Sequence, residues 1–362
     1  MDTVKVEFSD INKSWDKDIA DYHFDIYHLS GWIAASAIVD QGTPQGVVAT
    51  YKNKKVFLPI IIREVDAEHW DATSTYGYGG PLMDKSLTDA DLDIVLEEVR
   101  GFLFEKGCVS LFMRLHPVIN KAWIPTVGKA LTHGLTLMSD LRKSEEEHWS
   151  ETQNRHRRGI KKALKMNVVT KIERLTKESA VVFSNIYKET MAHVKADQYY
   201  FFDDDYFFNL LENLQDRILL ITAYQDGKAI GSSIYTICKE SGIMQFHLGG
   251  TLNAYIHLQP SKLITHVARN WGRENNFKTL HLGGGVGANL DSLYEYKKGF
   301  SSQELIFKTY RLVVNSEKYT ELVAGIWFTE DDLNSNFFPL YRKSPTKETA
   351  LVNTQTESLA DT

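Results

Sequence analysis

GIMQFHLGG at residues 242–250 and KTLHLGGG at residues 278–285 are two short apolar segments, and each ends in glycines. The residues between them, Pro260 to Asn275, have apolar side chains on one helical face, and proline suits the first turn of a helix. This order predicts a unit in which a strand, a helix and a second strand follow one another. Glycine at the strand ends permits positive φ angles and close approach of another backbone or a ligand.

A predicted hairpin precedes this unit, and the same succession occurs once before in the chain. The dipeptide Asp226-Gly227 is a strong turn signal, and Asn53-Lys54 is the expected turn of the earlier hairpin. The two units indicate an internal structural repeat. The expected elements are strands at Gly46 to Tyr51, Val56 to Arg63, Asp71 to Gly80 and Val109 to Leu115 with a helix at Ser86 to Lys106, and then strands at Ile218 to Gln225, Ala229 to Cys238, Gly242 to Leu248 and Lys278 to Leu282.

The chain is long enough for two domains, since one hydrophobic core rarely supports 362 residues. Helices are expected between the units, over Ser144 to Lys165 and Ala180 to Leu214, and Ser144 and Glu147 have the spacing of a capping box. We therefore expect an α/β protein with mixed sheets and tandem domains. The expected divisions are domains at residues 1–145 and 146–318, a closing segment at 319–343 and a disordered tail at 344–362.

Composition and charge exclude several classes of protein. Hydrophobic residues make up 43% and charged residues 24% of the chain, as in ordinary globular proteins. The N-terminus lacks the apolar run of a signal peptide, and no apolar run is long enough to cross a bilayer. Cys108 and Cys238 are too few for a disulfide framework, so a reducing cytoplasm is the expected compartment. The net charge of −6 argues against a protein that coats nucleic acid, but it allows a local basic pocket.

Three segments carry a resemblance to a known family. They are WSETQNRHRRGIKKALK at residues 149–165, the segment from Tyr187 to Phe207 with YKETM and YYFFDDDYF, and HLGGG followed by DSLYEYKKGF between His281 and Phe300. Together with YGYGGPL at residues 76–82, they resemble the Fem-type aminoacyltransferases of peptidoglycan bridges and related sugar N-acyltransferases of surface-polysaccharide clusters. Tyr296 stands where that family has the first phenylalanine of Phe-Lys-x-Gly-Phe. The chain lacks the long coiled-coil arm of several tRNA-dependent members and the usual GNAT phosphate loop.

The resemblance implies two tandem GNAT-like domains, with the substrate side in residues 1–145 and the acyl donor and the chemistry in residues 146–318. In that fold, two parallel strands diverge at their C-terminal ends, so that a thioester arm fits between them, and a helix N-terminus attracts the pyrophosphate. Glycine pairs also occur in simple tight turns, and that alternative stays open. The expected contacts with acyl-CoA are Leu248, Gly249, Gly250, Leu258, Gln259, Pro260, Ser261 and Lys262.

Acyl transfer to an amine needs a base for the proton and a donor for the developing oxyanion. His247 and His281 are the candidate bases, and a core histidine bonded to a carbonyl is the alternative for each. Lys297 matches the lysine with which the family handles charge at the transfer centre, although a Lys-Lys pair alone often marks a solvated face. Neither cysteine lies in a motif, so we expect direct attack of the amine on the thioester, and no metal site.

Substrate contacts are expected from aromatic and charged side chains. Four cations of the helix up to Lys165 share one face without a neighbouring acid, and they either grip a diphosphate or form a solvated basic face. Tyrosines suit stacking on a base or a sugar, with buried tyrosine as the alternative. The candidate substrate-binding residues are Tyr76, Tyr78, Arg158, Lys162, Tyr199, Tyr200 and Asp291.

Three functions follow as hypotheses. The first is an acyl-CoA-dependent N-acyltransferase for a nucleotide-linked amino sugar in surface-polysaccharide (O-antigen or lipopolysaccharide) biosynthesis, without a metal or a membrane span. The second is a tRNA-dependent aminoacyltransferase that builds peptidoglycan cross-bridges, and it predicts tRNA binding with steep salt dependence. The third is a non-catalytic scaffold that binds a nucleotide sugar.

Overall fold

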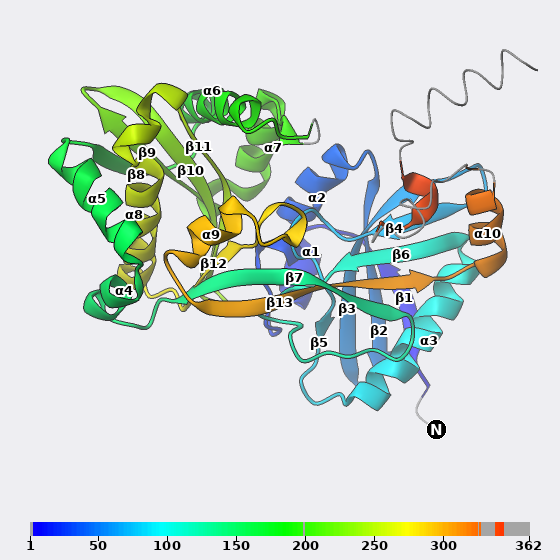
Figure 1. Ribbon diagram of the computed structural model, residues 1–362. Coiled ribbons are helices and arrows are strands. Elements are labelled where there is room, and N and C mark those ends of the chain that lie inside the picture. The colour runs from blue at the N-terminus through cyan, green and yellow to red at the C-terminus, as the bar shows by residue number, and fades with distance from the viewer. Residues whose placement is uncertain (1–2, 198–199, 325, 327–336, 344–362) are drawn as a thin grey trace, which may run out of the picture.

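The computed structural model describes residues 3–197, 200–324, 326 and 337–343. The expected tail at 344–362 and the candidate Tyr199 lie outside the described residues. The described part contains one mixed sheet with helices packed on it, so the expected α/β class is confirmed (Figure 1).

The second predicted unit is present with nearly the expected bounds. Asp226 and Gly227 have φ angles of 50° and 79°, as a two-residue hairpin turn requires. β11 runs on to Thr251, so Gly249 and Gly250 belong to the strand. The elements are β9 (Ile218–Gln225), β10 (Lys228–Cys238), β11 (Ile243–Thr251), α8 (Pro260–Glu274) and β12 (Thr279–Gly283).

The first predicted unit is also present, with two differences. Lys52 and Asn53 have φ angles of 50° and 59°, so the turn lies one residue before the expected Asn53-Lys54. β4 ends at Thr73, well before the expected Gly80, and the chain turns at Gly77, whose φ is 101°. The elements are β2 (Thr43–Tyr51), β3 (Lys54–Glu64), β4 (Trp70–Thr73), β5 (Leu82–Met83), α3 (Asp89–Glu105) and β6 (Cys108–Arg114).

Each helical segment expected between the units is broken into two helices. The first break lies at Thr152, whose ψ of 124° is extended, and the next N–H, that of Gln153, donates to the carbonyl oxygen of Gly299 at 2.9 Å. After the second break, the Asp203 side chain accepts the N–H of Tyr206 and starts a new helix. The elements are α4 (Glu145–Glu151), α5 (Asn154–Lys165), β8 (Val169–Arg174), α6 (Lys177–His193) and α7 (Asp204–Leu214).

The two units exchange their last strands, neither of which was expected from the sequence. β7 (Lys129–Asp140) follows the first unit in the chain but pairs with β12 of the second. β13 (Gln303–Val313) follows the second unit but pairs with β6 of the first, and it also pairs with β7. One sheet therefore runs through both units in the order β1-β2-β3-β4-β6-β13-β7-β12-β11-β10-β9-β8 (Figure 1). The expected domain boundary at residues 145 and 146 stays a prediction.

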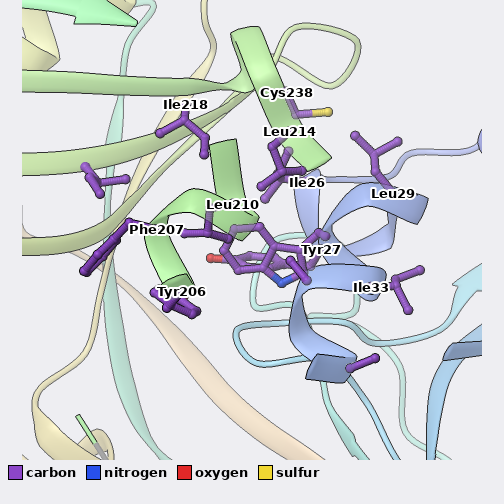
Figure 2. Close-up of a cluster of buried hydrophobic side chains, with 14 of the residues drawn as sticks. Ile26, Tyr27, Leu29, Ile33, Tyr206, Phe207, Leu210, Leu214, Ile218 and Cys238 are labelled. Atoms are coloured by element: carbon purple, nitrogen blue, oxygen red, sulfur yellow. The ribbon is translucent and has the colours of Figure 1, made fainter. Parts of the chain in front are cut away.

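A shared hydrophobic core joins the two units. Tyr27 and Ile33 of the first unit pack with Phe207 and Leu210 of α7 (Figure 2). Each unit also has a core of its own, under α3 in the first and under α8 in the second. The junction between the units is therefore fixed by packing as well as by the exchanged strands.

The remaining elements include β1 (Lys5–Ser9), α1 (Lys13–Asp18), η1 (Ile26–His28), α2 (Ser30–Val39), η4 (Asn253–Leu258), α9 (Ser292–Lys298) and α10 (Ser316–Ala324).

Candidate active site

β11 and β12 diverge at their C-terminal ends. Their parallel pairing stops at the pair Gln245 and His281. The register of β11 on β10 shifts at His247, which marks a β-bulge. β11 continues to Thr251, and no strand of the described residues pairs with its β12-facing edge beyond Gln245. A gap with unpaired strand backbone therefore opens between β11 and β12, as the resemblance implies.

Side chains of the last pair join the two strands where the gap begins. Nδ1 of His281 donates to Oε1 of Gln245 at 2.6 Å, and its Nε2 accepts from the Thr136 hydroxyl at 2.9 Å. Nε2 of Gln245 donates to Oδ2 of Asp25 at 2.6 Å, and Nε2 of His116 donates to the same oxygen at 3.0 Å. Asp25 and His116 belong to the first unit. The Gln245–His281 pair, which we name the clasp, is thus anchored by the other unit.

His281, a predicted base, is fully buried within this network. Burial, followed by the charges of His116 and Lys297, lowers its pKa well below the usual value, so its ring is neutral. Both ring nitrogens are engaged in hydrogen bonds with the protein. The role of His281 as a base stays a prediction, and its contacts favour a positioning role.

His247, the other predicted base, lies at the bulge of β11 and at the junction of the units. Its Nε2 is 2.8 Å from the hydroxyl of Tyr206, and its ring centroid lies 5.1 Å from that of Trp32 and 6.1 Å from that of Tyr76. Burial lowers the pKa of His247 to about 3. A base with so low a pKa is inefficient at neutral pH, so this role also stays a prediction.

Lys297 lies between the two diverging strands. Its Nζ donates to the carbonyl oxygen of Gly284, just after β12, at 2.5 Å, and it lies 5.4 Å from the ring centroid of Phe246 in β11. Burial lowers the pKa of Lys297 to about 8, although the negative charge of Asp291 raises this pKa. At neutral pH the gap therefore contains an ammonium group that is 7% exposed and mostly protonated.

Tyr78 reaches the same place from the first unit. A Cβ built on Gly283 would lie 3.3 Å from Nζ of Lys297 and 3.7 Å from the hydroxyl of Tyr78. Gly283 has a φ of 74°, a conformation that favours glycine. Burial raises the pKa of Tyr78, so its hydroxyl keeps its proton. A cation, a phenol and a glycine with a positive φ angle thus meet at the end of β12.

Leu248, Gly249 and Gly250 form the part of β11 beyond the bulge. They lie in a strand, so the alternative of a tight turn is wrong for this glycine pair. Glycine is needed for packing: a Cβ on Gly250 would lie 2.9 Å from the carbonyl oxygen of Ile186 in α6, and one on Gly249 would lie 2.7 Å from Oγ of Ser233. α6 therefore covers this part of the strand closely.

The first turn of α8 contains the other predicted donor contacts. Leu258 is buried, and Gln259, with a φ of 62°, leads into Pro260 at the helix start. Burial, followed by the charge of Arg155 in α5, lowers the pKa of Lys262, which forms no ion pair with a described residue. The free N–H of Ser261, the helix dipole and the nearby cations suit an anionic ligand.

The segments that carry the resemblance meet around α8 and α9. Nε2 of His156 in α5 hydrogen-bonds to the carbonyl oxygen of Tyr296 at 2.9 Å, and Gly299 leaves room for the His156 ring. The hydroxyl of Tyr296 donates to the carbonyl oxygen of Ser261 at 2.9 Å. Tyrosine in place of the family's phenylalanine thus adds a bond between α9 and the first turn of α8.

The remaining predicted substrate residues lie in different surroundings. Tyr76 lies beside His247 and Tyr78 beside His281 at the junction of the units, whereas Arg158 and Lys162 are exposed on α5. The carboxylate of Asp291 accepts the N–H of Tyr294 at 2.8 Å and caps α9, so its contacts are structural. Tyr200 is half-buried, and burial raises its pKa.

Four residues of the site were not expected from the sequence: Asp25, His116, Tyr206 and Gln245. Tyr206 lies in YYFFDDDYF and Gln245 in GIMQFHLGG, but neither residue was singled out there, and the four side chains meet only through the packing of the two units. A surface cavity of about 630 Å³ between α2, α6 and α7 is lined in part by Phe202 and Tyr206, and Tyr206 also bonds to His247. His247 is therefore next to this cavity.

Neither cysteine is placed for nucleophilic attack. Cys108 and Cys238 are buried, and burial raises the pKa of both thiols, that of Cys238 to about 12.

Among the residues that the structure describes, no group of three or more His, Cys, Asp and Glu side chains could hold a metal ion. In the same part of the chain, every helix is too short or too polar to span a bilayer.

Residues 150–298 match the family model described as an acetyltransferase (GNAT) domain. No curated protein matches the chain. Solved structures with a similar fold include FemX, at 13% identity over 87% of this chain and 99% of that chain, with a TM-score of 0.66. A conserved protein of unknown function from Bacteroides thetaiotaomicron VPI-5482 has 12% identity over 85% and 100% of the chains and a TM-score of 0.56. L-PGS from Bacillus licheniformis has 10% identity over 82% and 91% and a TM-score of 0.52.

Residues 150–298, which match the GNAT family model, contain the gap, α8 and Lys297, and this match gives the class of the protein. It is an acyltransferase with a GNAT fold, and it resembles the Fem-type enzymes. The expected resemblance, fold class and enzyme class are confirmed.

Proposed function

We propose that the protein is an acyl-CoA-dependent N-acyltransferase that acts on a nucleotide-linked amino sugar in surface-polysaccharide biosynthesis, in the cytoplasm. The observation that carries this proposal is the buried Lys297 ammonium between two diverging parallel strands. A thioester that lies along β11 brings its carbonyl to this cation.

The donor side of the site fits an acyl-CoA. Extended backbone at Leu248 to Gly250 offers hydrogen bonds to the amide groups of the pantetheine arm. The first turn of α8, with Ser261 and Lys262, suits the pyrophosphate. The fit rests on unpaired strand backbone and on a lysine without an ion-pair partner among the described residues.

The reaction needs little chemistry from the protein beyond placement and charge stabilisation. The amine nitrogen attacks the thioester carbon, and the negative charge that develops on the carbonyl oxygen is stabilised by the Lys297 ammonium. The C–S bond then breaks, an amide forms and CoA leaves as a thiolate that takes up a proton. The proton of the amine passes to water, because His281 is enclosed and the pKa of His247 is about 3.

The acceptor binds on the other side of Lys297, at the junction of the units. Tyr76 and Tyr78 are half-buried there, and His247 provides a neutral ring that can hydrogen-bond with a sugar hydroxyl or a base. Aromatic side chains of this kind stack on sugar and base rings. A nucleotide-linked amino sugar has both kinds of ring.

A tRNA-dependent aminoacyltransferase that builds peptidoglycan cross-bridges is the second candidate. The observation that favours it is the exposed basic surface of α5, where no acidic residue occurs between residues 152 and 172. Such a surface also fits a nucleic-acid backbone.

The decisive experiment is a thiol-release assay with a panel of acyl-CoA donors and amino-sugar nucleotides, run beside an assay with aminoacyl-tRNA and a muropeptide precursor. CoA release that requires a particular sugar nucleotide and disappears in Lys297→Met supports the first function. Transfer from aminoacyl-tRNA alone overturns it in favour of the second. Sugar-nucleotide binding without turnover of any pair supports the scaffold hypothesis.

A further inference from the structure

Three large aliphatic side chains are exposed at the end of α5 and the start of β8. Leu164, Met166 and Val169 are 55%, 45% and 61% exposed. Asn167, with a φ of 56°, makes the tight turn between the two elements, so the three side chains lie within six residues of one another at a projecting corner. We name residues 164–169 the tip. Isolated exposed aliphatic residues are common, but three at one turn form an apolar patch that packing does not explain.

Cations without acidic neighbours flank the tip. Residues 152–172 contain seven lysines and arginines and no aspartate or glutamate. Arg158, Lys162 and Lys165 are exposed and form no ion pair or side-chain hydrogen bond with a described residue. The segment that carries the tip is thus strongly positive, although the whole chain has a net charge of −6.

The tip points away from the rest of the molecule. α5 packs its buried face, with Ile160 and Ala163, on the second unit, and its basic face is turned outward. β8 is the terminal strand of the sheet. Figure 1 shows α5 at the outer side of the second unit, on the side opposite to the first unit. A large flat partner can therefore reach the tip without meeting the first unit.

We propose that the tip and its flanking cations dock the protein on the surface of an anionic phospholipid bilayer. Lysines and arginines attract the negatively charged headgroups, and the aliphatic side chains enter the boundary between headgroups and acyl chains. This combination favours a lipid surface over nucleic acid, because single-stranded nucleic acids stack on aromatic side chains and double helices are gripped through phosphates, neither of which uses exposed leucine or valine. The docking is peripheral and independent of the identity of the substrates.

The active site stays accessible in the docked protein. The N-terminal end of α5 is the end near Lys262 and Tyr296, and the tip is at its C-terminal end. Gly159 of α5 lies beside Lys262 and precedes Leu164 by five residues, so the first turn of α8 lies about 8 Å from the tip along the helix. The first turn of α8 is thus set back from the residues that enter the headgroups.

Co-sedimentation of the full chain with vesicles tests the proposal. We expect partitioning onto vesicles of phosphatidylglycerol and phosphatidylcholine mixed in equal parts, much weaker partitioning onto pure phosphatidylcholine, and loss of binding in high salt. Lys165→Glu should weaken partitioning at least about fivefold, which corresponds to one cation near an anionic surface. A combined Leu164→Ser, Met166→Ser and Val169→Ser variant should weaken it about tenfold or more.

Two matched controls lie on the first unit. Ile124 is 67% exposed and Lys121 is exposed, so Ile124→Ser and Lys121→Glu make the same chemical changes away from the tip and should leave vesicle binding unchanged. The serine variant of the tip should also keep its circular dichroism spectrum and its activity on soluble substrates, because none of its three residues lies in the site.

Three results would overturn the proposal. They are equal binding to charged and uncharged vesicles, no binding to either, and retention of RNA that depends on Lys165 but is indifferent to the serine variant. The last result would identify the basic surface as a nucleic-acid site.

Discussion

Gln245 and His281 are the last paired residues of β11 and β12, and a side-chain hydrogen bond of 2.6 Å joins them at the point where the two strands part. The position of this bond sets how far the gap extends toward the centre of the sheet. Asp25 of the first unit accepts from the same glutamine, so the start of the gap in one unit depends on a carboxylate of the other.

Replacing Gln245 with leucine should open the clasp. The variant leaves Nδ1 of His281 without a partner and removes one of the two hydrogen bonds to Oδ2 of the buried Asp25, which costs about 2–4 kcal/mol of the free energy of unfolding. Because the strands are then no longer held together at that point, we expect KM for the acyl donor to rise about tenfold, with a smaller change in kcat. Steady-state kinetics and urea denaturation measure the two effects.

Thr136→Val is the matched control for the clasp. It removes the bond to the other ring nitrogen of His281 and leaves the bond to Gln245 in place. It should cost about 1 kcal/mol of stability and leave KM for the donor unchanged. An equal rise of KM in both variants would show that loss of stability, and not the clasp, sets donor binding.

Lys297→Met should lower kcat about 10²–10³-fold, because the cation that faces the developing oxyanion is lost. An ammonium with a pKa of about 8 loses its proton as the pH rises through that value, so wild-type activity should decline above about pH 8. Lys297→Arg stays charged and should keep part of the activity without this decline. Lys298→Met is the control, since Lys298 is paired with Glu304 at the surface. A decline at the same pH in the arginine variant would remove Lys297 from the mechanism.

The same substitution should stabilise the fold. The pKa of Lys297 is lowered from 10.5 to about 8 in the folded protein, so at pH 7 the folded state holds a charge that burial penalises. Lys297→Met should therefore raise the free energy of unfolding at pH 7 by about 3 kcal/mol. In the wild type, stability should rise between about pH 8 and 10.5, where the unfolded chain still binds the proton and the folded chain does not. Thermal melts at pH 7 and pH 9.5 measure both trends, and a melting temperature that falls in Lys297→Met would contradict them.

The exchanged strands predict how fragments behave. A fragment of residues 146–318 lacks β7 and leaves the outer edge of β12 unpaired, so we expect it to aggregate. A fragment of residues 129–318 restores β7 beside both β12 and β13 and should be more soluble and more helical. Size-exclusion chromatography and circular dichroism compare the two. A well-folded, monomeric 146–318 fragment would show that the exchange contributes little to folding.

Buried histidines should make the protein sensitive to acid. Burial lowers the pKa of His247 to about 3 and that of His28 to about 4, so the folded state stays unprotonated at both sites while the unfolded chain binds protons below about pH 6.5. Stability should therefore fall as the pH drops from 6.5 to 4, by up to about 1.4 kcal/mol per pH unit for each histidine. Urea denaturation midpoints across this range measure how steeply stability depends on pH, and His247→Phe should reduce that dependence by the contribution of one histidine. An unchanged slope in that variant would place the proton uptake elsewhere.

Local patterns in the sequence were sufficient for the two repeated units. Turn dipeptides such as Asp226-Gly227 and a proline-led helix from Pro260 are signals that depend on a few neighbouring residues. The structure has the elements of the two units within about three residues of their expected bounds, except for β4, which ends at Thr73. Lys52 and Asn53 show the limit of such signals, because two adjacent dipeptides could form the same turn and the register of the strands decides between them.

Contacts between residues far apart in the chain could not be predicted from local sequence patterns. β7 and β13 pair with strands far away in the chain, and no local feature of Lys129–Asp140 indicates which strand it will join. The same holds for Asp25 and Gln245, which are separated by most of the chain and meet as buried hydrogen-bonding partners. Lys297 was found through the family resemblance, whereas its burial and low pKa required the packing of α9.

The exchange of β7 and β13 also restricts the motions with which this enzyme can select its substrates. Rotation of one unit against the other would break the pairing of β7 with β12 and of β13 with β6 as well as the shared core in Figure 2. Large hinge closure over a bound substrate is thus unavailable to it. Evolution of a new specificity on this scaffold has to proceed through side chains and loops that line a rigid crevice.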